Sequence, residues 1–140
     1  MSLQQQIVDE ARTWANTRFQ HQGRIKGLGV DCVGFISEVA KAVGIPVEIP
    51  HDYRPRDDGM VMLRLLKEHM ELVDVAQPGD VLALIDEALR DPEIPRHLAF
   101  VTEVTPKTTF IIHASQHGVK EHRMDSHWAK RIHSTWRIKQ

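Results

Sequence analysis

The chain lacks the features that mark several large classes of protein. It holds one cysteine, Cys32, so an internal disulfide cannot form, which excludes a small secreted scaffold held together by disulfides. No run of apolar residues is long enough to span a bilayer, so we expect no membrane partner. The first residues lack the basic segment and apolar run of a secretory signal peptide. We therefore expect a soluble protein made without its own export signal.

Charge and size indicate which partners and how many domains to expect. The formal net charge is -1 and the pI is near 6.8, so the sequence has no overall basic surface and we expect no nucleic-acid partner. The 140 residues, 41% of them hydrophobic, are enough for one core. We expect a single domain over residues 1–140.

The lone cysteine stands at the predicted start of a helix. Apolar or small residues recur at the spacing of one helical face from Cys32 to Val43. Asp31 suits the N-cap, and Gly44 suits the position after the last turn. The N–H groups and the dipole at a helix start stabilise an anion, so we expect a lowered pKa for the Cys32 thiol. An ordinary buried core cysteine fits this position equally well.

Two further helices and several loops are predicted before the sheet. Ser2 followed by Gln5 resembles a capping box and predicts a first helix to about Thr17. A stripe of methionine and leucine predicts another helix over residues 60–73. Glycines allow close backbone approach, so the loop before Cys32 is expected to face a substrate. The segments expected to be loops are residues 19–30, 46–59 and 86–96.

The second half of the chain predicts an antiparallel sheet. A strand at 81–85 follows a turn, and two β-rich runs at 97–104 and 108–113 are joined by a hairpin turn. Pairing that is symmetric about residue 105 would set His97 directly opposite His113, with Cβ atoms about 5 Å apart. An even register shift would keep both histidines on one face.

The chain is predicted to end in a loop and a closing strand. Residues 116–130 are expected to form a loop that contains His117, His122 and His127. His122 and His127 are expected on the surface, while the role of His117, four residues past His113, is left open. Alternation over residues 131–139 predicts the last strand.

Cys32, His97 and His113 are the residue types of a cysteine nucleophile with its base and orienting group. Cys32 would attack an acyl carbon, His97 would take and return the proton, and His113 would hold the His97 ring in the useful tautomer. A chain with nine histidines can offer two on neighbouring strands by chance, so other readings stay open. One is a histidine-metal protein, although no His-Glu-x-x-His helix occurs.

Four short motifs occur in order along the chain. They are Asp31-Cys32-Val33-Gly34-Phe35, Pro78-Gly79-Asp80-Val81, His97-Leu98-Ala99-Phe100-Val101, and Ile112-His113-Ala114-Ser115 with Gly118-Val119. As a set they resemble the motifs of the NlpC-type cysteine peptidases, which are bacterial cell-wall enzymes. Residues 19–32 are most similar to the branch encoded by phages, prophages and gene transfer agents, where the peptidase travels with the tail.

The resemblance implies a fold and a reaction. The fold would be an α+β, papain-like domain with N-terminal helices packed on a small antiparallel sheet of about five strands. The reaction would be thiol-dependent hydrolysis of an amide in the peptide stem of peptidoglycan, with no metal or organic cofactor. In this family the bond is typically the one between γ-linked D-glutamate and the following diamino acid. Cys32, His97 and His113 would be the catalytic residues.

The resemblance also implies substrate contacts and a location. Arg24, Lys26 and Arg96 are expected to pair with stem carboxylates. Val33 stands where the family usually has serine, and Phe19 where it usually has an aromatic hydroxyl. We expect phage tail or tail-tip proteins as further partners, and a protein made in the bacterial cytoplasm that acts in the cell wall or periplasm. The residues expected to contact substrate are Phe19, Arg24, Asp31, Val33, Gly34 and Arg96.

Two alternatives keep the same fold. In one the chain is a non-catalytic tail or assembly module that binds without cutting. In the other the thiol transfers the acyl group to another acceptor or cleaves a thioester.

Overall fold

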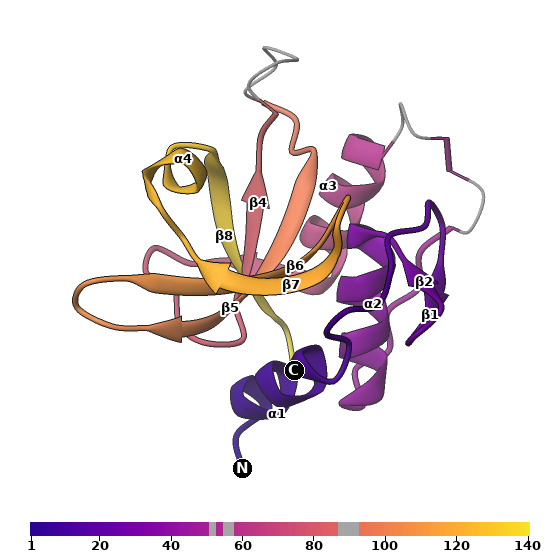
Figure 1. Cartoon of the computed structure of the whole chain (residues 1–140), viewed down its shortest axis with the longest axis horizontal. Coiled ribbons are helices and arrows are strands. Elements are labelled where there is room, and N and C mark those ends of the chain that lie inside the picture. The colour runs from indigo at the N-terminus through magenta and orange to yellow at the C-terminus, as the bar shows by residue number, and fades with distance from the viewer. Residues whose placement is uncertain (51–52, 55–57, 87–92) are drawn as a thin grey trace.

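Four helices and two antiparallel sheets make up the computed structural model, which describes residues 1–50, 53–54, 58–86 and 93–140. The larger sheet has the strand order β3-β8-β4-β5-β6-β7, and β1 with β2 forms a separate two-stranded sheet. Figure 1 shows α1, α2 and α3 gathered to one side of the curved large sheet. The elements are α1 (Leu3–Arg12), β1 (Arg24–Ile25), β2 (Gly29–Val30), α2 (Cys32–Ala42), α3 (Asp58–His69), β3 (Met70–Leu72), β4 (Val81–Leu84), β5 (His97–Val104), β6 (Thr109–Ser115), β7 (Gly118–Arg123), α4 (Ser126–Ala129) and β8 (Ile132–Ile138).

The α+β class is confirmed, while the expected count of about five strands was one short. The chain forms six strands in the large sheet because residues 70–72 and 118–123 also pair. The predicted loop at 19–30 also contains the short β1–β2 hairpin.

The first helix begins as predicted and ends early. The Ser2 Oγ accepts the Gln5 N–H at 3.1 Å. The helix stops at Arg12 rather than near Thr17, because the chain turns and Asn16 adopts a positive φ of 68°.

The central helix α2 forms where the sequence predicts it. The Asp31 carboxylate accepts the Gly34 N–H at 2.7 Å, and Gly44 takes the left-handed φ of 92° that follows many helices. The helix packs against β5, β6 and α1, and most of its residues are buried. Its first residue, Cys32, is therefore held in a fixed place relative to the sheet.

The predicted helix at 60–73 starts at Asp58 and ends at His69. Met70 to Leu72 pairs with β8 instead, with Met70 buried and Leu72 exposed. The strand is set by its antiparallel pairing, in which Met70 lies opposite Ile138 and Leu72 opposite Trp136. The inward side chains of the helix are Met62, Leu65 and Leu66, as expected.

The large sheet has two apolar faces. Leu98, Phe100 and Ile112 belong to the cluster shared with the helices. Ala99 and Ile111 belong to a second cluster, against which Trp128 of α4 packs. His97 is two residues from Ala99 on β5, and His113 is two residues from Ile111 on β6. Residues two apart in a strand share a face, so both histidines lie on the sheet face turned away from the body of α2.

A bulge in β5 sets the register of the two histidines. Near the turn Val104 pairs with Thr109, but beyond Thr102 the register shifts and Val101 pairs with Ile111. An extra residue in one strand turns the following side chains to the other face. Without Thr102 as this extra residue, His97 and His113 would lie on opposite faces.

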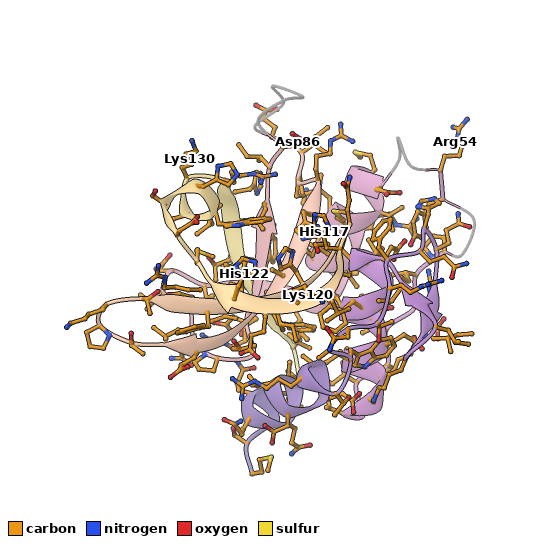
Figure 2. All side chains as sticks on the ribbon, in the orientation of Figure 1. Arg54, Asp86, His117, Lys120, His122 and Lys130 are labelled. Carbon is orange, nitrogen blue, oxygen red and sulfur yellow. The ribbon has the colours of Figure 1, made fainter. Side chains whose placement is uncertain are left out.

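Part of the predicted loop at 116–130 is strand and helix. Gly118 opens β7 with a φ of 97°, and a Cβ there would lie 2.9 Å from the Thr17 oxygen, so glycine is required. The strand pairs with β6 along its whole length. Figure 2 labels His117 before the strand and His122 within it. Thus His122 was wrongly expected to be a loop residue.

The Pro78–Val81 motif has a structural role. Asp80 is fully buried, and its carboxylate accepts two N–H groups of Arg137 at 2.8 and 2.9 Å and one of Gln4 at 2.9 Å. It also accepts the Gln77 N–H and closes the predicted turn. A buried carboxylate with this many donors ties α1 and β8 to the start of β4.

Two of the predicted loops are described only in part. Parts of the predicted loops at 46–59 and 86–96 lie outside the described residues. Tyr53, inside the first of these, is buried rather than exposed. Across the described ranges no helix combines the length and apolar character needed to cross a membrane.

Candidate active site

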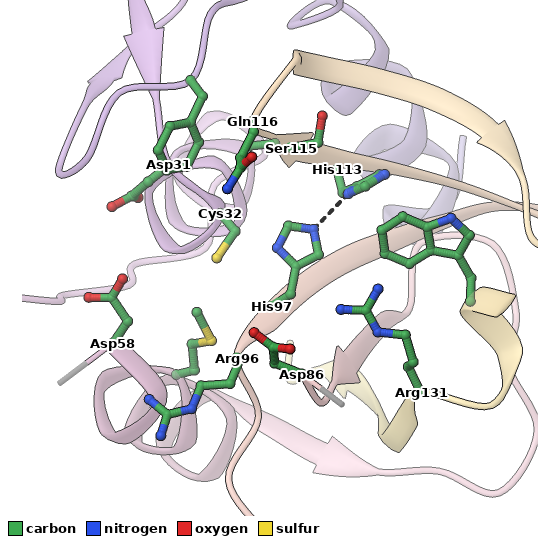
Figure 3. Close-up of a pocket in the computed structure, with 14 residues that line it drawn as sticks. Asp31, Cys32, Asp58, Asp86, Arg96, His97, His113, Ser115, Gln116 and Arg131 are labelled. Carbon is green, nitrogen blue, oxygen red and sulfur yellow. Dashed lines mark hydrogen bonds between the residues drawn. The ribbon is translucent and has the colours of Figure 1, made fainter. Parts of the chain in front are cut away.

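The three predicted catalytic side chains line one cavity of about 330 Å³. Cys32 comes from the start of α2, His97 from the start of β5 and His113 from β6. Figure 3 shows the Cys32 sulfur pointing into the cavity and the His97 ring lying between Cys32 and His113. The chain thus brings its only thiol to the same opening as two imidazole rings.

The surroundings of Cys32 differ from the expectation in one respect. Burial raises the pKa of the Cys32 thiol to about 12, the negative charge of Asp31 adds to the rise, and backbone hydrogen bonding from Leu98 opposes it. The residue is 7% exposed. The predicted lowering of the pKa was therefore wrong, because desolvation and the N-cap carboxylate outweigh the helix dipole. The resting thiol is neutral and needs a base.

His97 and His113 form the predicted pair. The His97 Nε2 lies 2.6 Å from the His113 Nδ1, and the rings meet edge to face with centroids 4.8 Å apart. In the observed register Phe100 pairs with Ile112, so His113 falls opposite Ala99 rather than opposite His97. The offset is two residues, which keeps both rings on one face as an even shift requires.

Both rings are neutral near pH 7. Burial lowers the pKa of His97 to about 4, and the positive charge of Arg131 lowers it further. Burial also lowers the pKa of His113 to about 3, with contributions from His97, His122 and Arg131. A neutral His97 can accept a proton, so it can serve as a general base.

The two lowered pKa values predict acid sensitivity of the fold. The unfolded chain protonates these rings below about pH 6.5 and the folded chain does not, so the free energy of unfolding should fall as the pH drops from about 6.5 to about 4. His97 alone accounts for a loss of about 3 kcal/mol. Urea unfolding at several pH values measures the slope.

A matched pair of variants isolates the effect on stability. His97→Gln should flatten the fall between pH 6.5 and 4, while His117→Gln, at an exposed histidine, should leave it unchanged. Equal slopes in the wild type and His97→Gln would contradict the assignment of the lowered pKa.

Three of the predicted substrate contacts line the cavity. Phe19 and Asp31 border it beside Cys32, and Arg96 borders it at the entry to β5. The carboxylate of Asp31 is already engaged, because it accepts N–H groups of Gly34 and Gln22 and the Tyr53 hydroxyl. Asp31 therefore fixes the helix start and the loop around it.

The other three lie away from the cavity. Val33 is 1% exposed and belongs to the hydrophobic core. Gly34 packs against the backbone of Gly23, where an added Cβ would lie 2.5 Å from the carbonyl oxygen. Arg24 donates to the Ile49 and Pro50 carbonyls and lines a separate depression on the β1–β2 hairpin.

Several residues around the site were not predicted from the sequence. His122 was predicted to lie on the surface, yet its Nε2 lies 2.7 Å from the His113 Nε2. The signal was the Ser115-to-Gly118 turn, which predicts a hairpin and puts His122 on the face of His113. The cavity is also lined by Asp58, Asp86, Gln116, Trp128 and Arg131.

The chain's one tyrosine supplies an aromatic hydroxyl close to the nucleophile. The Tyr53 hydroxyl donates to Asp31, next to Cys32, and the His21 ring packs edge to face on the tyrosine at 5.5 Å. This hydroxyl comes from after the cysteine in sequence, whereas Phe19 comes before it.

Within the described part of the chain, no group of three or more His, Cys, Asp or Glu side chains is arranged to hold a metal ion. The contacts among His97, His113 and His122 are hydrogen-bond contacts between ring nitrogens.

Three solved structures resemble this fold, and two of them are described as NlpC/P60 proteins. One is described as similar to a lipoprotein of the NLP/P60 family from Staphylococcus aureus subsp. aureus Mu50, with TM-score 0.71, 18% identity, and coverage of 99% of this chain and 42% of that one. The NlpC/p60 domain of the peptidoglycan hydrolase SagA matches with TM-score 0.58 and 21% identity, over 98% of both chains. A third, Ly7917, has TM-score 0.55 and 8% identity, over 99% of this chain and 63% of that one.

These likenesses concern the fold. This chain spans less than half of the staphylococcal protein and nearly all of the SagA domain. Neither the family models nor the curated proteins gave a match. The papain-like NlpC-type fold predicted from the motifs is confirmed.

Proposed function

We propose that this protein is a cysteine peptidase that hydrolyses an amide bond in the peptide stem of peptidoglycan. The proposal rests on one observation, the meeting of the only thiol and a hydrogen-bonded pair of imidazole rings at one open cavity. The NlpC/P60 fold supports it, because a protein of that fold is described as a peptidoglycan hydrolase.

The side chains allow a balanced reaction. His97 takes the proton of the Cys32 thiol while the sulfur attacks the acyl carbon, and the imidazolium then gives the proton to the departing amine. A water molecule attacks the thioester with His97 again as base, and the thiol is regenerated. The N–H groups of Cys32 and Val33 at the start of α2 have no carbonyl acceptor within the helix, and can bind the oxyanion.

Charged residues at the cavity suit a substrate rich in carboxylates. Arg96 and Arg131 both line it. The Arg96 Nε is buried and has no hydrogen-bond partner among the described residues, so an incoming carboxylate would satisfy a donor that is otherwise costly to bury. We propose that the bond cut lies between γ-linked D-glutamate and the following diamino acid.

The place of action is a further part of the proposal. The likeness of residues 19–32 to the phage, prophage and gene-transfer-agent branch supports a peptidase made in the bacterial cytoplasm and incorporated in a phage tail, with tail or tail-tip proteins as partners. The test is whether the chain sediments with tail particles of its source. Recovery of the chain only in the particle-free fraction would contradict its incorporation in a phage tail.

The function itself is tested on defined substrates. Purified protein incubated with peptidoglycan stem peptides should release fragments whose masses fit addition of one water across a single amide. Products carrying a different acceptor in place of water would indicate acyl transfer. Cleavage of thioester substrates with no cleavage of stem peptides would indicate a thioesterase.

Thiol alkylation separates the enzyme from a non-catalytic module of the same fold. If His97 acts as base toward Cys32, iodoacetamide should modify Cys32 faster in the wild type than in His97→Gln at pH 8. Equal rates of Cys32 alkylation in the two proteins, together with no cleavage of stem peptides, would favour a non-catalytic tail or assembly module.

A further inference from the structure

His122 takes no part in the reaction as described so far. It lies on β7, where Ile111 pairs with it and His113 pairs with Lys120, so the His122 ring shares a sheet face with His113. Its Nε2 lies 2.7 Å from the His113 Nε2, and its Nδ1 lies 2.9 Å from the Arg123 carbonyl oxygen. The Trp128 ring packs against both, with centroids 4.9 Å from His113 and 5.5 Å from His122.

The Arg123 carbonyl oxygen determines which nitrogen of the His122 ring carries the hydrogen. A carbonyl oxygen only accepts, so the His122 Nδ1 must carry the hydrogen. In a neutral ring the other nitrogen is then a pure acceptor, and the His122 Nε2 must accept from the His113 Nε2.

The positions of the hydrogens on His113 and His97 follow from that of His122. Since the neutral His113 carries its hydrogen on Nε2, its Nδ1 accepts, and the His97 Nε2 donates to it at 2.6 Å. The neutral His97 therefore keeps its lone pair on Nδ1. Figure 3 shows this second nitrogen of His97 on the side of the ring that faces Cys32.

We propose that His122 is a positioning residue: its bond to the Arg123 carbonyl sets the direction of the hydrogen bonds through His113 and leaves the lone pair of His97 on the nitrogen that faces Cys32. The consequence for turnover rests on the function proposed above, whereas the tautomers are a property of the folded protein alone. A His113 ring without His122 could donate from either nitrogen, and half of the resulting states would put a hydrogen on the His97 Nδ1, where it blocks proton transfer.

The experiment reads the tautomers directly. Protein labelled with ¹⁵N at histidine is studied at pH 8 by two-bond proton–nitrogen correlation, which distinguishes Nδ1–H from Nε2–H rings. We expect Nε2–H for His97 and His113 and Nδ1–H for His122. In His122→Leu, the His97 and His113 signals should move toward a mixture of tautomers.

Two further variants serve as controls. His122→Gln retains an amide oxygen that can accept from the His113 Nε2, so the Nε2–H tautomers of His97 and His113 should largely return. His117→Leu removes an exposed histidine just before β7 and should change neither ring. Each spectrum also reports whether the variant is folded. An unchanged His97 tautomer in folded His122→Leu, or an Nδ1–H ring at His97 in the wild type, would overturn the proposal.

Turnover provides the second readout. On stem peptides, His122→Leu should lower kcat in proportion to the fraction of His97 rings that carry the hydrogen on Nδ1, about twofold for an equal mixture, with little change in KM, because the tautomer of the base governs the chemical step. His122→Gln should restore most of the rate. If no stem peptide is cleaved by the wild type, the proposed function fails while the tautomer result still decides the role of His122.

Discussion

Replacing Cys32 by alanine is expected to lower stem-peptide hydrolysis by at least about 10⁴-fold, to the background rate, because the attacking atom is lost. Cys32 is the only cysteine, so no other thiol can take its place. The rate of release of the new amine, followed by mass spectrometry, measures the loss.

The control for the Cys32 variant is the stability of the fold. The sulfur sits at the edge of the core, so its removal should cost about 1 kcal/mol or less in urea unfolding, far too little to unfold the protein. Cys32→Ser keeps the shape of the side chain and should be nearly as inactive, since a serine hydroxyl beside a single weak base is a poor nucleophile. Wild-type turnover by folded Cys32→Ala would end the assignment of a cysteine peptidase.

Replacing His97 by glutamine is expected to cause almost the same loss. The Cys32 thiol has its pKa raised to about 12, so few thiolates form near pH 7 and the reaction depends on a base in contact with the sulfur. A thiol with a low pKa would retain part of its reactivity without the base, whereas this one should not. Measurement of kcat on the stem peptide tests this.

The double variant Cys32→Ala with His97→Gln tests whether the two residues act as one unit. Its rate should equal that of Cys32→Ala alone, since the members of a catalytic unit fail together. His113→Asn should lose less, because an asparagine oxygen can stand where the His113 Nδ1 accepts from His97. An additive loss in the double variant would mean that His97 serves the reaction by a route that does not involve the thiol.

The electrostatics of Cys32 show the limit of reasoning from local sequence. A helix start predicts a stabilised thiolate, and the N-cap and the helix bounds were read correctly. Asp31 caps the helix and also places a negative charge beside the sulfur, while the packed sheet removes the surrounding water. Desolvation depends on which distant strands cover a group, so it could not be inferred from residues 31–43.

The histidines give a second example. His97 and His113 lie on one face of the sheet as predicted, but the predicted register, with the two histidines directly opposite, differs from the observed register by two residues. Near the turn the paired residue numbers, such as 104 and 109, add to an odd sum, and the sum becomes even only beyond the Thr102 bulge. His122 was missed because residues 118–123 lack the alternation of a half-buried strand, and only their pairing with β6 makes them one.

The sequence alone determined the elements that depend on neighbouring residues: the capped helix of Cys32, the turn at Asp80, the hairpin around residue 105, and the motif order that led to the papain-like fold. The tertiary structure decided which side chains meet. It set the register at Thr102, the neutral state of the thiol and the contact between His113 and His122, because strand pairing and desolvation are long-range effects that join residues far apart in the chain.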